Sequence, residues 1–422
     1  MNNVVHLLEE RGLLDNITSP DLVKAVESPL TVYAGFDPSS DSLQAGNFAS
    51  IMALCHFQRC GHKIICLVGG ATGMIGDPSG KSADRNLLSE EQVEHNLAGI
   101  RENLSRFLDF KHPAAPAVIV NNNDWMKEFT FIRFLRDVGK HFRMGAMLGK
   151  ESVKARLESE AGISFAEFSY QLLQAYDFLR LYDTAGCKVQ IGGSDQWGNI
   201  TAGVDLIRKL RGVEAYGLTI PLVCDSAGQK FGKSEGNAVY LDHRKTSYYD
   251  FYQFFWRTTD VDVIRFLKIF TFLPLNEIKA LEEQVGKEPE KRAAQTRLAE
   301  EVTRTVHGAE GLRVAQRASA VLFGESMEGM NAADLLGIFA NVPSAEMARD
   351  KTVGMPIVDL AAAAGLCKSK GEARRLVEQG GLYVNNRRVV GLEAKVTSSD
   401  MVDGRVLALR SGKKTFHLVK LR

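Results

Sequence analysis

Apolar residues in the first half of the chain alternate between short strand-like runs and stretches with helical spacing. Residues 31–36 (TVYAGF) and 63–68 (KIICLV) have the length and composition of buried β-strands, and residues 48–57 repeat apolar side chains at the period of an α-helix. Further strand-like runs lie at 117–120, at the start of 188–200 (KVQIGGSDQWGNI) and at 218–223. This alternation predicts an open α/β sheet, in which ligands bind at the carboxyl ends of the strands.

The second half of the chain is mostly helical by pattern and ends in a basic segment. Residues 248–323 have helical spacing, and residues 341–356 contain Pro343, Gly354 and Pro356, which favour a linker. An alanine-rich helix, a basic helix at 368–379 and the strand-like GLYVNNRRV follow. The pattern therefore predicts a helical region and a separate small C-terminal domain.

Charge is unevenly distributed along the 422 residues, although the net charge is only +1. Residues 366–422 contain 13 basic and 5 acidic residues, a balance of +8, so the other 365 residues carry 39 basic and 46 acidic ones, a balance of −7. A basic segment attached to an acidic body favours contact with a polyanion such as a nucleic acid. On charge alone, a solvated basic surface stays open as the alternative.

Composition bounds the class of protein. With 45% apolar and 24% charged residues, the chain is typical of globular proteins with about two to four domains. It has no run of about 18 apolar residues and no leader-peptide pattern, so we expect neither a membrane span nor secretion. The six cysteines form no CxxC pair. Although His56 and His62 lie near Cys55, Cys60 and Cys66, reduced buried thiols are favoured over a metal site.

The glycine-rich stretch GGATGMIGDPSGKS at residues 69–82 invites comparison with phosphate-binding loops. A Walker A loop requires glycine where this chain has Ile75, and the GxGxxG fingerprint also fails. The stretch is instead predicted to be a turn that carries Asp77 and Lys81 and is followed by Arg85.

Polar residues at two other places are candidates for a ligand site. Tyr170, Gln174 and Asp177 are spaced i, i+4 and i+7, so they share one face of a helix where apolar core residues would normally lie. Asp195 and Gln196 follow a double glycine at the end of a strand-like run. Side chains at such strand ends lie where open α/β sheets bind ligands.

A third candidate is the lysine-bearing stretch QKFGKSEGN at residues 229–237. It follows the last strand-like run, and its two lysines are three residues apart. We expect a mobile loop that can neutralise the charge of a departing polyphosphate.

Five sequence blocks occur together in the order and spacing of one enzyme family. They are YAGFDPSSDSL (33–43), GGATGMIGDPSGKS (69–82), EFSYQLLQAYDF (167–178), QIGGSDQWGNI (190–200) and KFGKS (230–234). On these blocks the chain resembles bacterial-type tyrosyl-tRNA synthetase, a class I aminoacyl-tRNA synthetase, along essentially its whole length. The resemblance implies ATP-dependent activation of L-tyrosine to tyrosyl adenylate with release of pyrophosphate. The tyrosyl group would then pass to the 3′-terminal adenosine of tRNA(Tyr).

The resemblance also implies roles for single residues. The substrate phenol would bind Tyr33 and Asp177, its ammonium group Asp77, Tyr170 and Gln174, and its carboxylate Gln196. The residues expected to face ATP are Gly35, Asp37, Ser39, Gly46, Gly193, Asp195 and Lys233. Those expected to act on the polyphosphate or the transition state are Gln44, Asn47, Lys81, Arg85, Lys230, Lys233 and Ser234. ATP would enter with Mg²⁺, and no prosthetic group or protein metal site is implied.

The HIGH sequence of class I synthetases reads Gln44-Ala45-Gly46-Asn47 in this chain, so both histidines are missing. Asparagine at the last position is familiar in the family, which leaves Gln44 as the departure. We expect Gln44 and Asn47 to share one helix face and to donate neutral hydrogen bonds worth about 0.5–1.5 kcal/mol each. An active enzyme is therefore expected. The alternative is a catalytically impaired homologue that acts as an RNA-binding protein.

The same resemblance implies the order of domains. We expect an α/β, Rossmann-like parallel-sheet catalytic domain at 1–225 with a helical dimerisation insertion at about 121–185, the KFGKS loop and its connection at 226–245, an α-helical anticodon-region domain at 246–340, a linker at 341–356 and a small α+β S4-like RNA-binding domain at 357–422. RNA phosphates would meet Lys368, Lys370, Arg374, Arg375, Arg387, Arg388, Arg410, Lys413 and Lys414. We further expect a cytoplasmic homodimer without membrane contact. Tryptophan is disfavoured as the substrate because an indole does not require the pair of Tyr33 and Asp177.

Overall fold

The computed structural model describes residues 3–79, 88–158, 162–234, 237–339, 342–412 and 415–422. Its contacts divide the chain into two compact units, one of residues 1–246 with 254–306 and one of residues 247–253 with 307–422. Within these described ranges, no helix is both long and apolar enough to cross a membrane.

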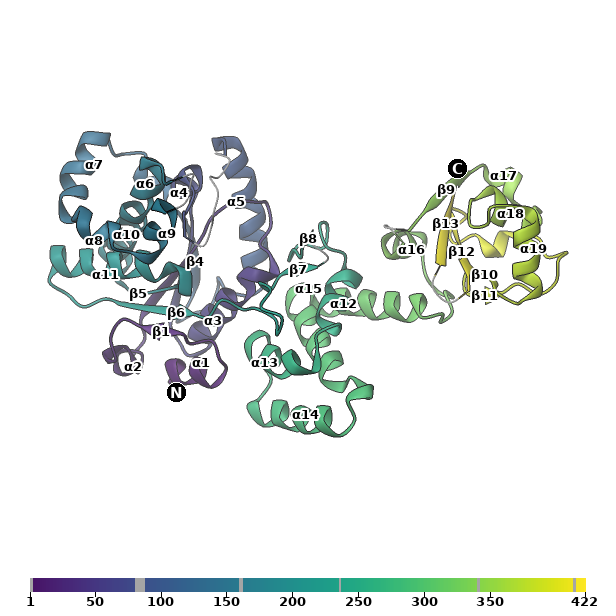
Figure 1. The fold of residues 1–422 in the computed structure, drawn as a ribbon, viewed down its shortest axis with the longest axis horizontal. Helices are drawn as coiled ribbons and strands as arrows, with labels where there is room; N and C mark the ends of the chain where they lie inside the picture. The colour runs from purple at the N-terminus through teal and green to yellow at the C-terminus, as the bar shows by residue number, and fades with distance from the viewer. Residues whose placement is uncertain (1–2, 80–87, 159–161, 235–236, 340–341, 413–414) are drawn as a thin grey trace. The chain divides into compact units, whose positions relative to one another are not determined.

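A six-stranded sheet forms the centre of the first unit (Figure 1), in the order β1-β6-β5-β2-β3-β4. The strands are β1 (Asn16–Ile17), β2 (Thr31–Phe36), β3 (Lys63–Val68), β4 (Ala117–Asn121), β5 (Cys187–Gly193) and β6 (Tyr216–Ile220). All neighbouring pairs are parallel except β1 with β6. The predicted α/β sheet is confirmed, although β6 begins before position 218 and ends at Ile220, because the next residue, Pro221, cannot donate a ladder hydrogen bond.

The strand order reverses beside β2, and this reversal creates the place for a site. From β2 the chain continues outward through β3 to β4, whereas β5 and β6 lie on the other side. Tyr33 on β2 therefore lies between Ile65 on β3 and Gln190 on β5. Helices diverge to opposite faces at such a point, which leaves a crevice at the carboxyl ends of the strands.

Helices cover the sheet from both sides. On one face, α10 (Phe165–Ala185) and α11 (Trp197–Arg211) pack against the buried side chains of Tyr33, Ile65 and Leu67. On the other face, α3 (Phe48–Arg59) packs against β2 and β3. The remaining helices before β4 are α1 (Val4–Glu10), α2 (Asp21–Ala25), α4 (Gly70–Ile75) and α5 (Glu90–Leu104).

The glycine-rich stretch is not the turn that its sequence favours, because Gly70–Ile75 forms helix α4. Its glycines permit close packing rather than a phosphate loop. A Cβ atom on Gly70 would lie 2.1 Å from Asn121 Oδ1, and one on Gly73 would lie 2.9 Å from Pro38 Cδ. Glycine at these positions lets α4 approach β4 and the end of β2 more closely than any other residue would.

Between β4 and β5 the chain inserts short helices before α10. They are α6 (Asn123–Met126), α7 (Phe131–Asp137), α8 (Met144–Leu148) and α9 (Glu151–Leu157). After β6, the hairpin strands β7 (Lys233–Ser234) and β8 (Asn237–Ala238) pair with each other. The predicted helical region follows as α12 (Tyr248–Trp256), α13 (Asp260–Phe270), α14 (Leu275–Lys287) and α15 (Ala293–Leu322), the last kinked at Gly308 where φ is 72°.

The second unit contains a five-stranded sheet in the order β11-β10-β12-β13-β9. Its strands are β9 (Ser344–Met347), β10 (Leu382–Val384), β11 (Arg387–Arg388), β12 (Val406–Ser411) and β13 (Thr415–Leu421). Its further helices are α16 (Ala332–Ile338), α17 (Arg349–Thr352), α18 (Ile357–Ala363) and α19 (Lys370–Glu378). Because β9 pairs in parallel with β13, the segment interpreted as a linker contains an edge strand of this sheet.

Candidate active site

A cavity opens at the strand reversal, at the carboxyl ends of β2 and β5. It brings together residues from four of the five sequence blocks, namely all of them except KFGKS. The sequence-predicted residues among its lining are Tyr33, Gly35, Asp37, Gly46, Asn47, Asp77, Tyr170, Gln174, Asp177, Gly193, Asp195 and Gln196. Parts of the chain that are distant in sequence therefore converge on one pocket.

Other candidates lie elsewhere or outside the described part of the chain. Gln44 is not among the residues that line the cavity, and Ser39 lines a separate depression with Asp41 and His95. Lys230 lines a neighbouring pocket with Asp225 and Arg257. Lys81, Arg85, Lys413 and Lys414 fall outside the described residues, and Lys233 and Ser234 are described only as backbone of β7.

One end of the cavity holds a buried hydroxyl and a buried carboxylate. Tyr33 and Asp177 are each 1% exposed. The Tyr33 hydroxyl has no hydrogen-bond partner among the described residues. Asp177 accepts hydrogen bonds from Asn122 Nδ2 at 2.9 Å and from Trp125 Nε1 at 2.8 Å. A buried hydroxyl without a partner is costly, so this end is suited to a ligand that carries its own hydroxyl group.

Burial sets the protonation of both groups. Burial raises the pKa of Asp177 to about 7, against the lowering effect of the hydrogen bonds from Asn122 and Trp125. Burial, followed by the nearby charge of Asp177, raises the pKa of Tyr33 well above its ordinary value. The tyrosine is therefore a neutral donor at pH 7, and Asp177 can change charge near that pH.

The sequence did not single out Asn122 or Trp125, which hold Asp177 in place. Asn122 follows β4 directly and Trp125 lies in α6 just after it, so the only sequence signal for them was their place after the end of a third strand. Asn122 Nδ2 also donates to Thr72 Oγ1 at 3.0 Å, which connects α4 to the Asp177 carboxylate. Tyr170 donates from its hydroxyl to Asp37 Oδ1 at 3.2 Å, so a second carboxylate in the cavity is also held by a neutral donor.

The opposite wall of the cavity is polar and acidic. Gln196 Nε2 donates to Asp77 Oδ2 at 2.6 Å, and Gln196 Oε1 accepts from Gln174 Nε2 at 3.2 Å. Burial, and after it the charge of Asp77, raises the pKa of Asp195. Within the described part of the chain, no lysine, arginine or histidine lines this cavity. The carboxylates are therefore suited to bind a cationic ligand group.

The Gln44-Ala45-Gly46-Asn47 segment does not place Gln44 and Asn47 on one helix face, as the sequence had predicted. Gln44 has extended backbone angles (φ −101°, ψ 161°), and only Ala45–Asn47 form a 3₁₀ turn. The Gln44 backbone N–H donates to Asn47 Oδ1 at 3.0 Å, which caps this turn. Asn47, the last residue of the turn, lines the cavity. Gln44 precedes the turn and does not line the cavity.

The basic candidates in the second unit differ in exposure. Lys368, Lys370, Arg374, Arg375, Arg387 and Arg388 are exposed. Arg410 is only 8% exposed, and its guanidinium lies 3.9 Å from the ring centroid of Tyr383. The prediction that Arg410 meets RNA phosphates is therefore wrong, because its stacked side chain belongs to the interior of the domain. Lys370 and Arg387 are also ion-paired, with Asp359 and Asp400 respectively.

Among the described residues, no group of three or more histidine, cysteine, aspartate or glutamate residues is arranged to hold a metal ion. The cysteines Cys55, Cys60, Cys66, Cys187, Cys224 and Cys367 are all free thiols.

Comparisons with known proteins agree along the whole chain. The family model described as tRNA synthetases class I (W and Y) matches residues 24–324, and that of the tyrosine–tRNA ligase SYY-like C-terminal domain matches residues 334–419. The chain is 50% identical to the tyrosine–tRNA ligase of Protochlamydia amoebophila, covering 100% of this chain and 99% of that protein. It is 51% identical to the enzyme of Bacillus caldotenax, covering 98% of each.

A solved structure gives a similar result. The C-terminally truncated mitochondrial tyrosyl-tRNA synthetase of Aspergillus nidulans has a TM-score of 0.68 and 34% identity to this chain, covering 76% of it and 95% of the fungal chain.

Proposed function

The chain belongs to the tyrosine–tRNA ligases of the class I synthetase family, and we propose how its own residues carry out the reaction. The ligase consumes ATP to join L-tyrosine to tRNA. The observation that carries the proposal is the buried Tyr33 hydroxyl, which lacks a partner among the described residues and lies in the same cavity as Asp177. We infer that the phenol of the substrate completes this pair.

At the closed end of the cavity, the substrate phenol both donates and accepts. Its hydroxyl donates to the Asp177 carboxylate and accepts from the Tyr33 hydroxyl. Asn122 and Trp125 position Asp177 for this role through their two hydrogen bonds. Phenylalanine would leave Tyr33 and Asp177 unsatisfied, so the pocket selects against it.

At the acidic wall, the substrate ammonium group binds near Asp77, Tyr170 and Gln174, while Gln196 orients the carboxylate. Asp77 and Gln196 are already linked by a 2.6 Å hydrogen bond. This link supports the assignment because it fixes both groups before substrate arrives, which reduces the entropy lost on binding. Asp37, held by Tyr170, then faces the ribose of ATP together with Gly35, Gly193 and Asp195.

In the activation step, a tyrosine carboxylate oxygen attacks the α-phosphorus of ATP. The new bond is an acyl–phosphate bond, the bond to the bridging oxygen breaks, and pyrophosphate leaves. No protein nucleophile is required, so catalysis consists of positioning and of stabilising phosphate charge. We assign this charge stabilisation to Lys230 and Lys233, helped by Lys81 and Arg85, with Ser39, Gly46 and Ser234 along the nucleotide. Mg²⁺ would enter with ATP as part of the substrate.

We propose that Asn47, and not Gln44, is the side chain of the altered HIGH segment that contacts the reacting phosphates. Asn47→Ala is expected to lower kcat for tyrosyl adenylate formation about 5- to 10-fold, which corresponds to the loss of one neutral hydrogen bond. Gln44→Ala and Gln44→His are expected to stay within about twofold of the wild type because Gln44 does not line the cavity. Tyrosine-dependent ATP–pyrophosphate exchange is the measurement.

The same exchange assay tests the proposed function as a whole. Wild-type protein without tyrosine-dependent exchange would contradict the proposed mechanism and favour the catalytically impaired homologue. A more than tenfold gain in kcat for Gln44→His would contradict the proposal that Asn47, and not Gln44, contacts the reacting phosphates.

Tyrosine binding should depend on pH through Asp177. Since burial raises the pKa of this carboxyl to about 7, it is ionised above that pH and accepts a charge-assisted hydrogen bond from the phenol. As the pH falls through 7, the carboxyl becomes neutral and the bond weakens. We expect the Kd for tyrosine, measured by calorimetry, to rise about 5- to 10-fold between about pH 8 and pH 5.5. A Kd that is independent of pH in the wild type would contradict this role.

We propose that the helical insertion at about 121–185 is a dimer interface. The supporting observation is a set of apolar side chains that a monomer would leave in water: Phe131, Ile132 and Phe165 are 64%, 71% and 65% exposed. Light scattering should give twice the mass of one chain, and a monomer at micromolar concentration would contradict the proposal.

We further propose that tRNA phosphates contact the exposed basic residues of the S4-like domain, whose sheet also includes β9 from the segment interpreted as a linker. A cytoplasmic location fits the six free thiols, because a reducing compartment keeps such groups unpaired. Cell fractionation tests the location.

A further inference from the structure

The hairpin that carries Lys233 is hydrogen-bonded directly to the altered HIGH segment. Val239, just after the hairpin, donates from its N–H to Gly232 O at 2.8 Å and accepts from the Ala45 N–H at 2.8 Å. Leu241 donates from its N–H to Leu43 O at 2.9 Å. The segment that leaves the KFGKS hairpin and the segment that enters the 3₁₀ turn therefore form one short antiparallel ladder.

Glycine makes this approach possible. Gly232 has φ of 101°, in the left-handed region, and a Cβ atom on it would lie 2.6 Å from the Gly46 backbone N. No larger residue fits there without a shift of the backbone. The two motifs are therefore in contact at their backbones, and the position of one decides the position of the other.

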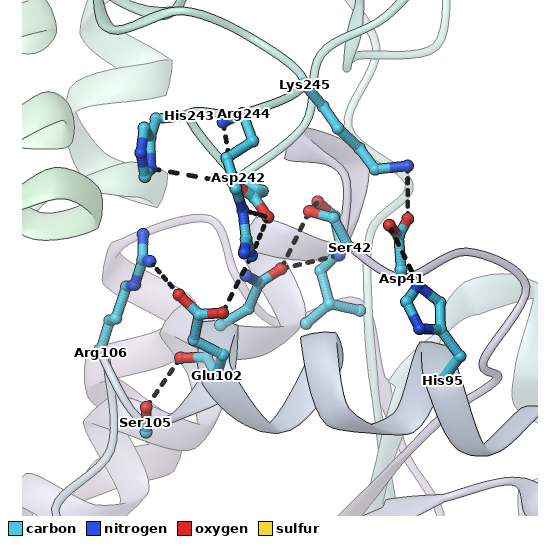
Figure 2. Close-up of polar contacts among 12 residues, drawn as sticks. Asp41, Ser42, His95, Glu102, Ser105, Arg106, Asp242, His243, Arg244 and Lys245 are labelled. Atoms are coloured by element: carbon cyan, nitrogen blue, oxygen red, sulfur yellow. Dashed lines mark hydrogen bonds and ion pairs between the residues drawn. The ribbon is translucent and has the colours of Figure 1, made fainter.

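Two groups of ion pairs hold this ladder from the outside (Figure 2). Lys245 pairs with Asp41. Arg244 pairs with Asp242 through Nε–Oδ2 at 2.8 Å and with Glu102 of α5 through Nη2–Oε2 at 2.9 Å. We call these five residues the loop-base clamp. Each group joins the segment after the hairpin to the segment before the turn or to α5.

Helix α5 supports both sides of the ladder. Glu102 pairs with Arg244, and the adjacent Asn103 accepts at Oδ1 from the Leu43 N–H at 2.9 Å and from the Ser42 hydroxyl at 3.0 Å. Asp242 is only 3% exposed. Burial by itself would raise the pKa of Asp242, but the hydrogen bonds from Arg244 outweigh it and lower the pKa, so this carboxylate is charged at neutral pH.

We propose that Arg244 and Lys245 are positioning residues for adenylate formation, because they fix the base of the KFGKS hairpin against the altered HIGH segment. The inference rests on the proposed role of Lys230 and Lys233 in binding the polyphosphate. Neither Arg244 nor Lys245 lines the substrate cavity. They act through the backbone of the hairpin, whose displacement by even a fraction of an ångström separates the lysines from the leaving group.

The exposure of these pairs indicates whether their loss will change kcat or the stability of the fold. Lys245 and Asp41 are each 34% exposed, and an ion pair between partly exposed side chains contributes little to global stability. Arg244 differs because its partner Asp242 is 4% exposed, so the loss of Arg244 would leave a buried carboxylate unpaired. Removing the Lys245–Asp41 pair should therefore change kcat without unfolding the protein. The pair of Arg211 and Asp183, at 40% and 32% exposure and 2.6 Å, is a matched pair that lies between α10 and α11, away from the clamp.

The test uses the full-length protein and the rate of tyrosyl adenylate formation at saturating tyrosine and ATP. Arg244→Met, Lys245→Met and Asp41→Asn are each expected to lower kcat about fivefold, the change in population that one half-exposed ion pair supplies. The Kd for tyrosine should stay at the wild-type value in all three variants. The melting temperature should stay unchanged in Lys245→Met and Asp41→Asn and should fall in Arg244→Met, which leaves the buried Asp242 carboxylate unpaired. Arg211→Met is the control and should leave kcat unchanged.

A double substitution separates the ion pair from other effects. Lys245→Met combined with Asp41→Asn should lose no more than either change alone, because the pair can be broken only once. Asp41→Lys combined with Lys245→Asp should recover most of the lost kcat. A merely structural role would lower the melting temperature together with kcat in the single variants.

Distinct outcomes separate this inference from the proposed function. If wild-type protein forms no adenylate, the proposed function fails. If the wild type is active and the clamp variants keep full kcat, the inference is wrong. It is also wrong if losses of Lys245→Met and Asp41→Asn add and the exchanged pair recovers nothing, or if kcat falls only together with tyrosine binding.

Discussion

Asp177→Asn is expected to lower kcat/KM for tyrosine about 10- to 100-fold while leaving kcat/KM for phenylalanine unchanged or higher. The carboxylate is the charged acceptor for the substrate phenol, and a hydrogen bond to a buried charged group is worth about 1.5–3 kcal/mol. Phenylalanine makes no such bond, and it gains when the unpaired charge is removed. Competition between the two amino acids in ATP–pyrophosphate exchange is the measurement.

Two controls accompany this substitution. Asp183→Asn changes an aspartate on the same helix, α10, that pairs with Arg211, and should leave the selectivity unchanged.

The second control is the stability of the Asp177→Asn variant. The folded-state pKa of Asp177, about 7, lies above its ordinary value of 3.8, so its contribution to stability is present below the ordinary pKa and lost as the pH rises through 7. At about pH 8 the asparagine variant should therefore not be less stable on account of this charge. Equal losses for tyrosine and phenylalanine would contradict the proposed pocket.

A chain that ends after Gly324 is expected to keep adenylate formation within about twofold and to lose tRNA charging about 100-fold or more. The residues that line the substrate cavity all lie between positions 33 and 222. The exposed basic residues of the second unit, which would neutralise RNA phosphates, are removed. Single-turnover adenylate formation and aminoacylation of tRNA(Tyr), measured on the same preparation, separate the two steps.

The structure also decides where this truncation should be made. A cut after Asp350 would leave β9 without its partner β13 and would expose Phe339, whose ring packs against that of Phe416 at a centroid distance of 5.0 Å. The cut at Gly324 removes Phe339 together with Phe416 and leaves Val321 and Leu322 as the remainder of that core.

Charge neutralisation in the intact chain provides an independent check on the truncation. Arg374→Gln with Arg375→Gln should weaken charging and reduce its salt dependence, while activation is unchanged. Equal charging by the truncated chain would overturn the RNA-binding role of the second unit.

Local sequence was enough for the elements and for much of the site. The runs 31–36 and 63–68 are strands β2 and β3 with the bounds that their apolar residues predicted. Tyr170, Gln174 and Asp177 share a helix face because their spacing matches the helical period, and all three line the cavity. Such features follow from neighbours within a few residues, so the sequence determines them without knowledge of the fold.

Contacts between distant segments could be decided only by the tertiary structure. Trp125 and Asn122 bind Asp177 across 52 and 55 residues, and nothing in their local sequence indicates that partner. The same holds for Arg410, whose charge suggested the surface although Tyr383 and the fold of its sheet enclose it. Gln44 lies outside the cavity because the turn begins one residue later than its motif suggested.

The sequence by itself thus determined the α/β class, the enzyme family and most residues of the pocket, since these depend on periodicity and on ordered motifs. Only the tertiary structure decided which groups hold one another in place, including the ion pairs around Arg244. The reason is physical: backbone preference is a property of neighbouring residues, whereas burial and pairing depend on which distant segments the packed core brings together.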